Sequence, residues 1–132
     1  MKKINPLARY FETNEWAIRG TNEFVIGITD FAQTVFGDIV FVELPKIGQT
    51  FKQGTTFAIT ESNKTTSNVS SPISGTITAI NEVLQTNPNL LNESPYDEGW
   101  LVKIKATNEN EWAELMTAPQ YQAYIGVFFN KT

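Results

Sequence analysis

Short stretches rich in β-branched and aromatic residues alternate along the chain with turn residues such as Gly, Pro and Asn. Stretches of this kind are typical of β-strands. The pattern predicts strands over residues 9–11, 15–19, 24–28, 38–44 and 100–105, and two more on either side of position 64. Short strands at close intervals, with helices confined to the edges, indicate a mainly β sandwich or barrel.

The stretch Asp38–Leu44 has the clearest alternation of the predicted strands. In a regular strand, successive side chains point to opposite faces of the sheet. Ile39 and Phe41 would then share one face, and Val40 and Val42 the other. The alternation therefore places Ile39 together with Phe41 and away from Val42.

Helices are predicted only around the strands. Thr29 has the residue type of a helix N-cap and Gly37 that of a helix end, so a brief helix is expected between them. One or two helical turns are expected within residues 81–92. A C-terminal helix is expected from near Asn108, and Pro119 either breaks it or begins a second helix through Ile125.

Length and composition are those of one folded domain that spans residues 1–132. Apolar residues make up 41% of the chain, so a real core is expected and disorder is not. The net charge of −4 argues against nucleic acid and anionic membranes as partners. No secretory signal and no membrane-spanning stretch is recognisable, so a cytoplasmic location is expected.

The chain contains no Cys and no His. Without Cys there are no disulfides, thiolate metal ligands or Cys nucleophiles, and without His there are no Ser-His-Asp triads or zinc sites of the usual kind. Carboxylates gather at Asp97–Glu98 and at Glu109–Glu114, but neither group offers a paired acid and base with a sign of burial. The sequence therefore disfavours an enzyme and predicts no metal site.

One lysine lies between two strand-like arms within Thr56–Ile80. The arms would form a hairpin that turns at Asn63 and Lys64, because Asn tolerates the positive φ of primed two-residue turns. This turn would put Lys64 at an exposed tip. Such a lysine is suited to carrying a covalent group, although its spacing alone is typical of an ordinary solvated turn lysine.

Five segments of the chain match one family in their order and spacing. They are GITDFAQ at residues 27–33, GDIVFVELP at 37–45, ITESNK ending at Lys64, SPISGTITAIN at 71–81 and ESPYDEGWLVKI at 93–104. Together they resemble the H-protein family of the glycine cleavage system, and the resemblance covers most of the chain. It implies a barrel-sandwich hybrid, the fold of lipoyl and biotinyl domains, with short peripheral helices and a C-terminal helix.

The resemblance also implies a covalent cofactor. Lys64 would carry lipoate in amide linkage, and Glu61 and Gly75 stand where the family has the Glu and Gly that help the lipoylating enzyme to recognise the hairpin. A Gly at that place would let a neighbouring turn take a conformation that other residues resist. Biotin is disfavoured, because the lysine of biotin carriers usually lies between two Met and here its neighbours are Asn63 and Thr65.

In this family the H protein is a carrier and not an enzyme. The resemblance implies that the lipoyl arm shuttles the aminomethyl group of glycine between glycine decarboxylase, aminomethyltransferase and dihydrolipoyl dehydrogenase. It also implies that a lipoate-protein ligase, or a lipoyl or octanoyl transferase, modifies the chain.

Three positions depart from the family's pattern near the cleft that shelters the loaded arm. Asn14 stands where the motif usually has His, Phe31 where the helix usually begins with His or Tyr, and Asn68 where an acidic residue is common. Glu15 remains as in the family and is expected to face the cationic amine of the aminomethyl group. The missing carboxylate at Asn68 would remove a second partner for that amine.

Two other functions stay open. An H-like carrier would still be lipoylated on Lys64 but would relay lipoate to 2-oxoacid dehydrogenases, or serve a redox-linked modification system, with a relaxed cleft. An unmodified binding module would keep the fold and use the acidic surface or the apolar C-terminal tail, residues 126–129, to hold a partner.

Overall fold

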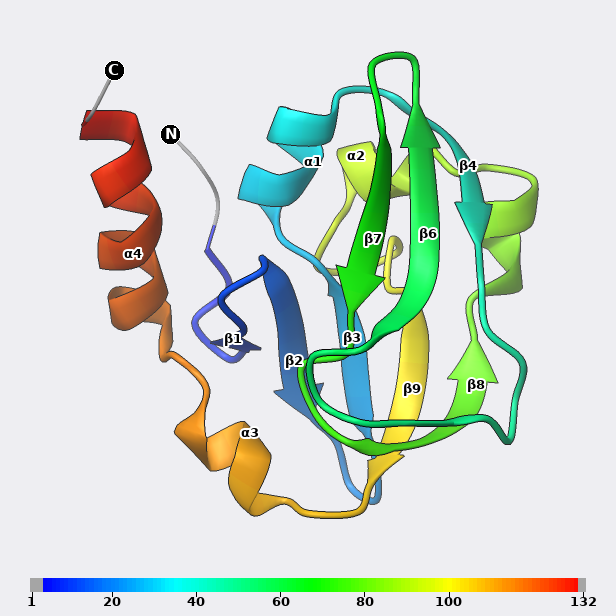
Figure 1. The fold of residues 1–132 in the computed structure, drawn as a ribbon, viewed down its shortest axis with the longest axis vertical. Helices are drawn as coiled ribbons and strands as arrows, with labels where there is room; N and C mark the ends of the chain where they lie inside the picture. The colour runs from blue at the N-terminus through cyan, green and yellow to red at the C-terminus, as the bar shows by residue number, and fades with distance from the viewer. Residues whose placement is uncertain (1–3, 131–132) are drawn as a thin grey trace.

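The computed structural model of the protein describes residues 4–130, without the side chains of residues 127–130. Two β-sheets form the body of the molecule (Figure 1). The six-stranded sheet has the order β1 (Arg9–Tyr10), β2 (Glu15–Arg19), β3 (Phe24–Ile28), β9 (Val102–Ala106), β8 (Gly75–Ile80) and β5 (Thr50–Phe51). The three-stranded sheet has the order β4 (Ile39–Glu43), β6 (Thr56–Ser62) and β7 (Thr66–Ser70).

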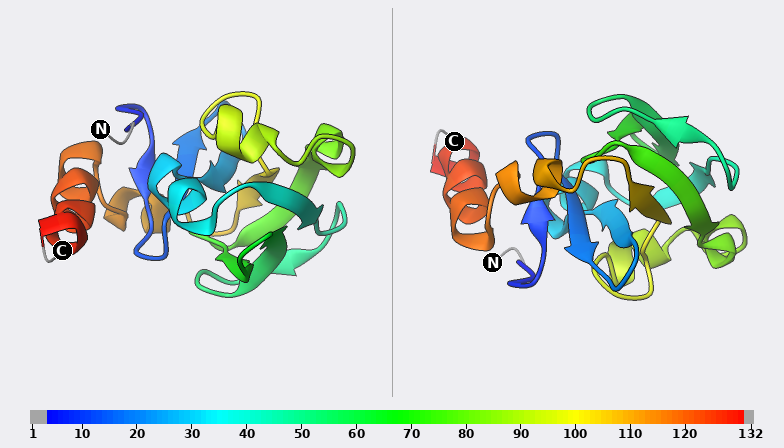
Figure 2. Two further views of the ribbon diagram at one scale, coloured as in Figure 1. Left: turned by 90° about the horizontal axis from the view of Figure 1, so that it is seen from above. Right: turned by 90° about the horizontal axis from the view of Figure 1, so that it is seen from below.

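The helices are short and lie around the sheets. They are α1 (Asp30–Phe36), the 3₁₀ turn η1 (Glu82–Gln85), α2 (Leu90–Glu93), α3 (Asn110–Glu114) and α4 (Ala118–Asn130). Figure 2 shows α4 at one side of the molecule, outside both sheets. Within residues 4–130, no helix combines the length and the apolar character needed to cross a membrane.

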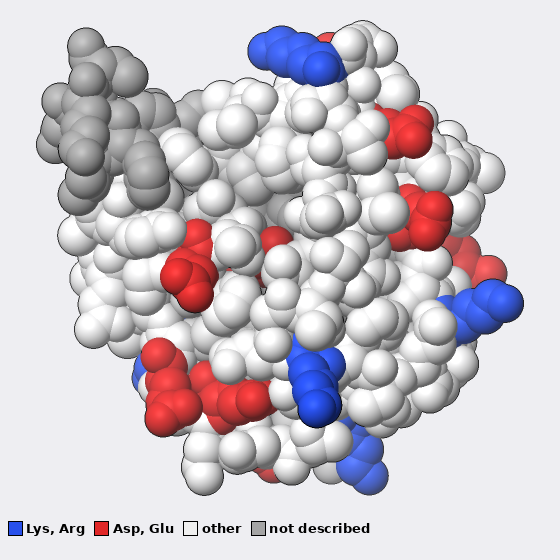
Figure 3. Space-filling model, in the orientation of Figure 1, with Lys and Arg blue, Asp and Glu red and all other residues white. Residues whose placement is uncertain are grey.

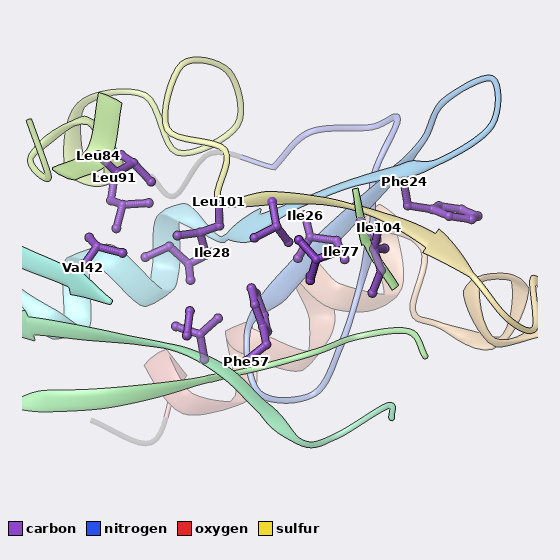
Figure 4. Close-up of a cluster of buried hydrophobic side chains, with 14 of the residues drawn as sticks. Phe24, Ile26, Ile28, Val42, Phe57, Ile77, Leu84, Leu91, Leu101 and Ile104 are labelled. Carbon is purple, nitrogen blue, oxygen red and sulfur yellow. The ribbon is translucent and has the colours of Figure 1, made fainter. Parts of the chain in front are cut away.

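The main core lies between the two sheets. Ile26 and Ile28 of β3 and Ile77 of β8 are buried, as is Phe57 of the opposite sheet. Figure 4 shows these side chains gathered in the space between the two layers. Burial of this much branched and aromatic surface is the main stabilising contribution to a fold of this size. The architecture is the mainly β sandwich, with peripheral helices, that the strand pattern predicts.

A second buried cluster attaches α4 to the body. The rings of Tyr10 in β1 and Tyr121 in α4 stack with their centroids 4.4 Å apart and an interplanar angle of 6°. Ala8, Trp16 and Ile125 complete the buried part of this cluster. The aromatic stack therefore helps to hold α4 against β1.

The alternation expected for Asp38–Leu44 is wrong. The pairing of β4 with β6 shifts register between Ile39 and Phe41, as in a β-bulge. Ile39 and Val42 are consequently buried, whereas Val40 and Phe41 are 52% and 47% exposed. The extra residue of the bulge turns Phe41 away from the core, so that its ring lies on the surface of this sheet.

The expected helix ends are confirmed. The Oγ1 of Thr29 accepts a hydrogen bond from Ala32 N (3.1 Å), and Gly37 follows α1 with φ of 85°. The second alternative for Pro119 is also confirmed, because it lies in the first turn of a separate helix, α4, that continues to Asn130. The prediction that the apolar tail, residues 126–129, holds a partner concerns side chains of residues 127–129, which lie outside the part of the chain that the structure describes.

Candidate functional site

Lys64 lies at the exposed tip of the β6–β7 hairpin, as predicted. Ser62 N donates to Thr65 O (2.8 Å), and the Ser62 hydroxyl oxygen accepts from Lys64 N and Thr65 N at 3.2 and 3.1 Å. The prediction of a primed turn is wrong. Such a turn needs positive φ at Asn63 or Lys64, but Asn14 is the only non-glycine residue with positive φ in the described chain. A serine side chain, and not the conformational tolerance of Asn63, holds the turn.

The stem of Lys64 lies over the end of α1. A Cβ placed on Gly37 would lie 3.5 Å from both Cδ and Cε of Lys64, and 3.8 Å from its Nζ. Neither an ion pair nor a hydrogen bond of the Nζ is found in the part of the chain that the structure describes. The lysine therefore has a supported stem and a free amine.

Asn92 holds the backbone beneath this lysine. Its Nδ2 donates to Gly37 O (2.8 Å) and to Gln33 Oε1 (2.9 Å), and its Oδ1 accepts from Ile39 N (2.9 Å). One side chain thus ties the end of α1 to the start of β4. The sequence offers no signal for this role, because the partners lie 53 to 59 positions away along the chain.

Glu15 is buried, although it is a carboxylate. Its Oε2 accepts a hydrogen bond from Ser70 N (2.9 Å), and its Oε1 accepts one from the Thr13 hydroxyl. The next amide, Ser71 N, bonds to Thr55 O on the β6 side, so Ser70 N points outward from the free edge of β7. Burial raises the pKa of Glu15 to about 7, which these hydrogen bonds only partly offset.

Asn68 lies near this contact, and Phe31 lies beside the second buried cluster. Asn68 is exposed on β7, two residues before Ser70 and opposite Ile59. Phe31 is half-buried in the first turn of α1 and packs against the cluster that contains Trp16. Figure 3 shows this face of the molecule hollowed beside the hairpin, with an acidic group in the hollow and few charges around it.

Asn14 is engaged with α4. It has φ of 76°, and its Oδ1 accepts a 2.9 Å hydrogen bond from the Tyr121 hydroxyl. The same hydroxyl lies 2.7 Å from the Oγ1 of Thr29, the N-cap of α1. Tyr121 therefore joins the residue before Glu15 to the start of α1, a role that helical spacing alone did not reveal.

The structure does not bring Glu61 and Gly75 together. Glu61 is exposed on β6 beside the tip, whereas Gly75 opens β8 after the far end of β7, and Figure 1 shows these ends on opposite sides of the molecule. The turn explanation for Gly75 is wrong, because it is a strand residue without positive φ. A Cβ on it would lie 2.3 Å from Lys105 O, so Gly permits the close approach of β9.

Two packed sheets that present a free lysine on a stiff hairpin define a carrier domain of the barrel-sandwich class. The family model for the glycine cleavage H-protein matches residues 8–127. The chain belongs to this family.

Similar proteins and a solved structure agree with this family assignment. The glycine cleavage system H protein of Sodalis glossinidius is 43% identical over 126 residues, which cover 95% of this chain and 96% of that protein. The H protein of Bacillus cereus strain AH187 is 47% identical over 113 residues, which cover 86% and 89%. The crystal structure of the Mycobacterium marinum H protein superposes with a TM-score of 0.85 at 32% identity, covering 93% of this chain and 99% of that one.

Proposed function

We propose that this chain is the lipoyl carrier of a glycine cleavage system and that lipoate is attached to Lys64 as an amide. The observation that carries the proposal is the free amine at the hairpin tip, supported below by Gly37. Acylation of this amine breaks no ion pair within residues 4–130. The names of the relatives, glycine cleavage system H proteins, support the same role.

The cofactor supplies the chemistry, and the chain positions it. Bound lipoate would supply a disulfide that can be reduced, loaded with the aminomethyl group of glycine and reoxidised. The paired strands β6 and β7 hold Lys64 at an exposed tip, while Gly37 and Asn92 fix the surface beneath its stem. The chain itself, which we propose to be one carrier domain over residues 1–132, needs no catalytic residue for this task.

Glu15 is the residue best placed to meet a cationic amine. Its buried carboxyl group lies at the free edge of the hairpin strand, where Asn68 contributes a neutral side chain. In a site that excludes water, the ionised carboxylate would stabilise a positive amine more strongly than it does in solution. The arm cleft of this protein would therefore rely on Glu15 without a carboxylate at position 68.

The partners follow from the proposal. A lipoate-protein ligase, or a lipoyl or octanoyl transferase, would modify Lys64. Glycine decarboxylase, aminomethyltransferase and dihydrolipoyl dehydrogenase would then act on the arm in turn. The expected cytoplasmic location stays a prediction.

Reconstitution tests the pathway. The lipoylated chain is added to purified glycine decarboxylase, and exchange of labelled bicarbonate into the carboxyl group of glycine is measured. We expect exchange to require the lipoylated form and to be lost with Lys64→Arg. Absence of exchange with a fully lipoylated chain would contradict the role in glycine cleavage.

One observation favours a second carrier function. The exposed Asn68 is neutral, and Asn14 is occupied by Tyr121, so two positions of the family's cleft differ in chemistry. A carrier that relays lipoate to 2-oxoacid dehydrogenases would not need to hold an amine. In the reconstitution, it would show lipoyl transfer to an acyltransferase subunit but no bicarbonate exchange.

A further inference from the structure

The turn between β1 and β2, residues 11–14, lies next to the buried carboxyl group of Glu15. The Thr13 hydroxyl donates to Glu15 Oε1, and Glu15 Oε2 accepts from Ser70 N (2.9 Å). Asn14, between Thr13 and Glu15, has φ of 76°, which is uncommon for a residue other than Gly. Because Asn14 separates the two side chains, its backbone conformation decides whether they meet.

Two tyrosine hydroxyls of α4 hold this turn from outside the sheets. The Tyr121 hydroxyl donates to Asn14 Oδ1 (2.9 Å), and the Tyr124 hydroxyl donates to Glu12 O (2.7 Å). The two tyrosines are three residues apart, a spacing that places them on one face of a helix. Tyr121 also lies 2.7 Å from the Oγ1 of Thr29, so it connects the turn to the N-cap of α1.

The space between the turn and α4 is not filled by packing. A cavity of about 350 Å³ lies there, bordered by Phe11, Glu12 and Tyr124. From the body of the protein, Thr29 N donates to Asn14 O (3.0 Å). The hydroxyls of α4 therefore restrain the turn at a place where side-chain packing does not.

We infer that Tyr121 and Tyr124 are positioning residues for Glu15: α4 holds the turn at residues 11–14 so that the carboxyl group stays against β7, where it would meet the amine of the loaded arm. This inference rests on the proposed function. The tyrosines act through the turn, since the hydrogen bonds of the carboxyl group go to Thr13 and Ser70. Burial raises the pKa of Glu15 to about 7, and a turn released from α4 would admit water to this group.

Amide hydrogen exchange tests the positioning and needs no cofactor. The double variant Tyr121→Phe/Tyr124→Phe keeps both rings and loses both hydroxyls. In the unlipoylated full chain, exchange of Ser70 N–H should become about tenfold faster relative to Ser71 N–H, which bonds to Thr55 O. Global unfolding exposes both amides, so their ratio is insensitive to a general loss of stability.

Tyr10→Phe is the matched control. The Tyr10 hydroxyl belongs to the same aromatic cluster, but it bonds to Asn5 N (2.8 Å) and Asn5 O (2.7 Å), outside the turn. Its loss should leave the ratio of the two exchange rates as in the parent. An unchanged ratio in the double variant, or an equal change in Tyr10→Phe, would overturn the positioning role.

The lipoylated proteins test whether this position of Glu15 matters for the arm. Each protein is loaded by glycine decarboxylase with glycine, and hydrolysis of the loaded arm is followed by the release of ammonia. The double variant should hydrolyse about fivefold faster than the parent and Tyr10→Phe, because its carboxyl group no longer stays beside the amine. Equal hydrolysis rates would overturn the inference alone. A lipoylated parent that glycine decarboxylase does not load would overturn the proposed function, and the arm role with it, whatever the amide exchange shows.

Discussion

The side chain of Glu15 caps the free edge of the lysine hairpin: its Oε2 accepts a 2.9 Å hydrogen bond from the backbone N–H of Ser70. This bond joins β2 of the larger sheet to β7 of the smaller one. It also places the buried carboxyl group of Glu15, whose pKa is raised to about 7, against β7, the strand that leads from the tip. We therefore expect the charge state of this group to affect the stability of the fold and the proposed arm cleft.

The raised pKa makes stability depend on pH. The unfolded chain releases the Glu15 proton near pH 4.5 and the folded protein keeps it until about pH 7. Because the folded state binds more protons in this interval, its stability should fall as pH rises through it, by about 3 kcal/mol at most. Glu15→Gln should remove this dependence, as measured by urea unfolding at pH 5 and pH 8.

The exposed neighbour Glu12 provides the control for that measurement. Glu12→Gln should keep the pH dependence of the parent. Parallel pH profiles for the parent and Glu15→Gln would show that Glu15 does not titrate in this range in the folded protein.

Asn92 is expected to be a stability hot spot although it is only half-buried. Asn92→Ala would remove partners from Gly37 O, Gln33 Oε1 and Ile39 N. The free energy of unfolding should fall by about 2–3 kcal/mol, since two part-buried backbone groups and one side-chain amide would lose their hydrogen bonds. Urea unfolding measures it. Asn87→Ala, an exposed change on the same segment, should be nearly neutral, and an equal loss in both variants would refute the role of Asn92.

Tyr121 is expected to contribute through its ring and its hydroxyl separately. Tyr121→Phe would keep the stack on Tyr10 but lose the contacts with Thr29 and Asn14, at a cost of about 1–2 kcal/mol. Tyr121→Ala would also lose the ring and should cost about 3–5 kcal/mol. Thermal unfolding of both variants measures how much stability comes from the hydroxyl group and how much from the ring. Equal losses would mean that the hydroxyl contacts account for the whole effect.

Gly37 is expected to act on both stability and modification. Its φ of 85° and ψ of −165° form a conformation that is nearly restricted to Gly, so Gly37→Ala should cost about 1–3 kcal/mol. The new Cβ would also contact the Lys64 stem. Gly48→Ala is the control, because Gly48 also has positive φ but nothing lies within 4 Å of a Cβ there. Both variants should unfold at lower urea, but only Gly37→Ala should change the rate of lipoylation. Equal lipoylation rates for Gly37→Ala and Gly48→Ala would show that Gly37 does not influence the modification of Lys64.

Features that depend on neighbouring residues were predictable from the sequence. The N-cap at Thr29 and the helix end at Gly37 depend on local backbone conformation, and the residue types at these two positions predict them. The lysine tip was also predictable, because two strand-like arms of similar length need a turn between them. These local signals and the family resemblance were sufficient for the fold and for the position of Lys64.

Features that depend on distant partners were not predictable in this way. The bulge that exposes Phe41 arises from the register between β4 and β6, which alternation within one strand cannot show. The roles of Asn92 and Tyr121 arise from hydrogen bonds to residues 53 to 107 positions away. The burial of Glu15 likewise requires the two sheets to be assembled.

The most direct test of the carrier role is an intact mass measurement, followed by peptide mapping, on protein from its native host. We predict one lipoyl increment, located on Lys64, and none in Lys64→Arg, which should fold normally because the side chain is exposed. An unmodified Lys64 in cells whose other lipoyl proteins are loaded, or an increment on another lysine, would contradict the account.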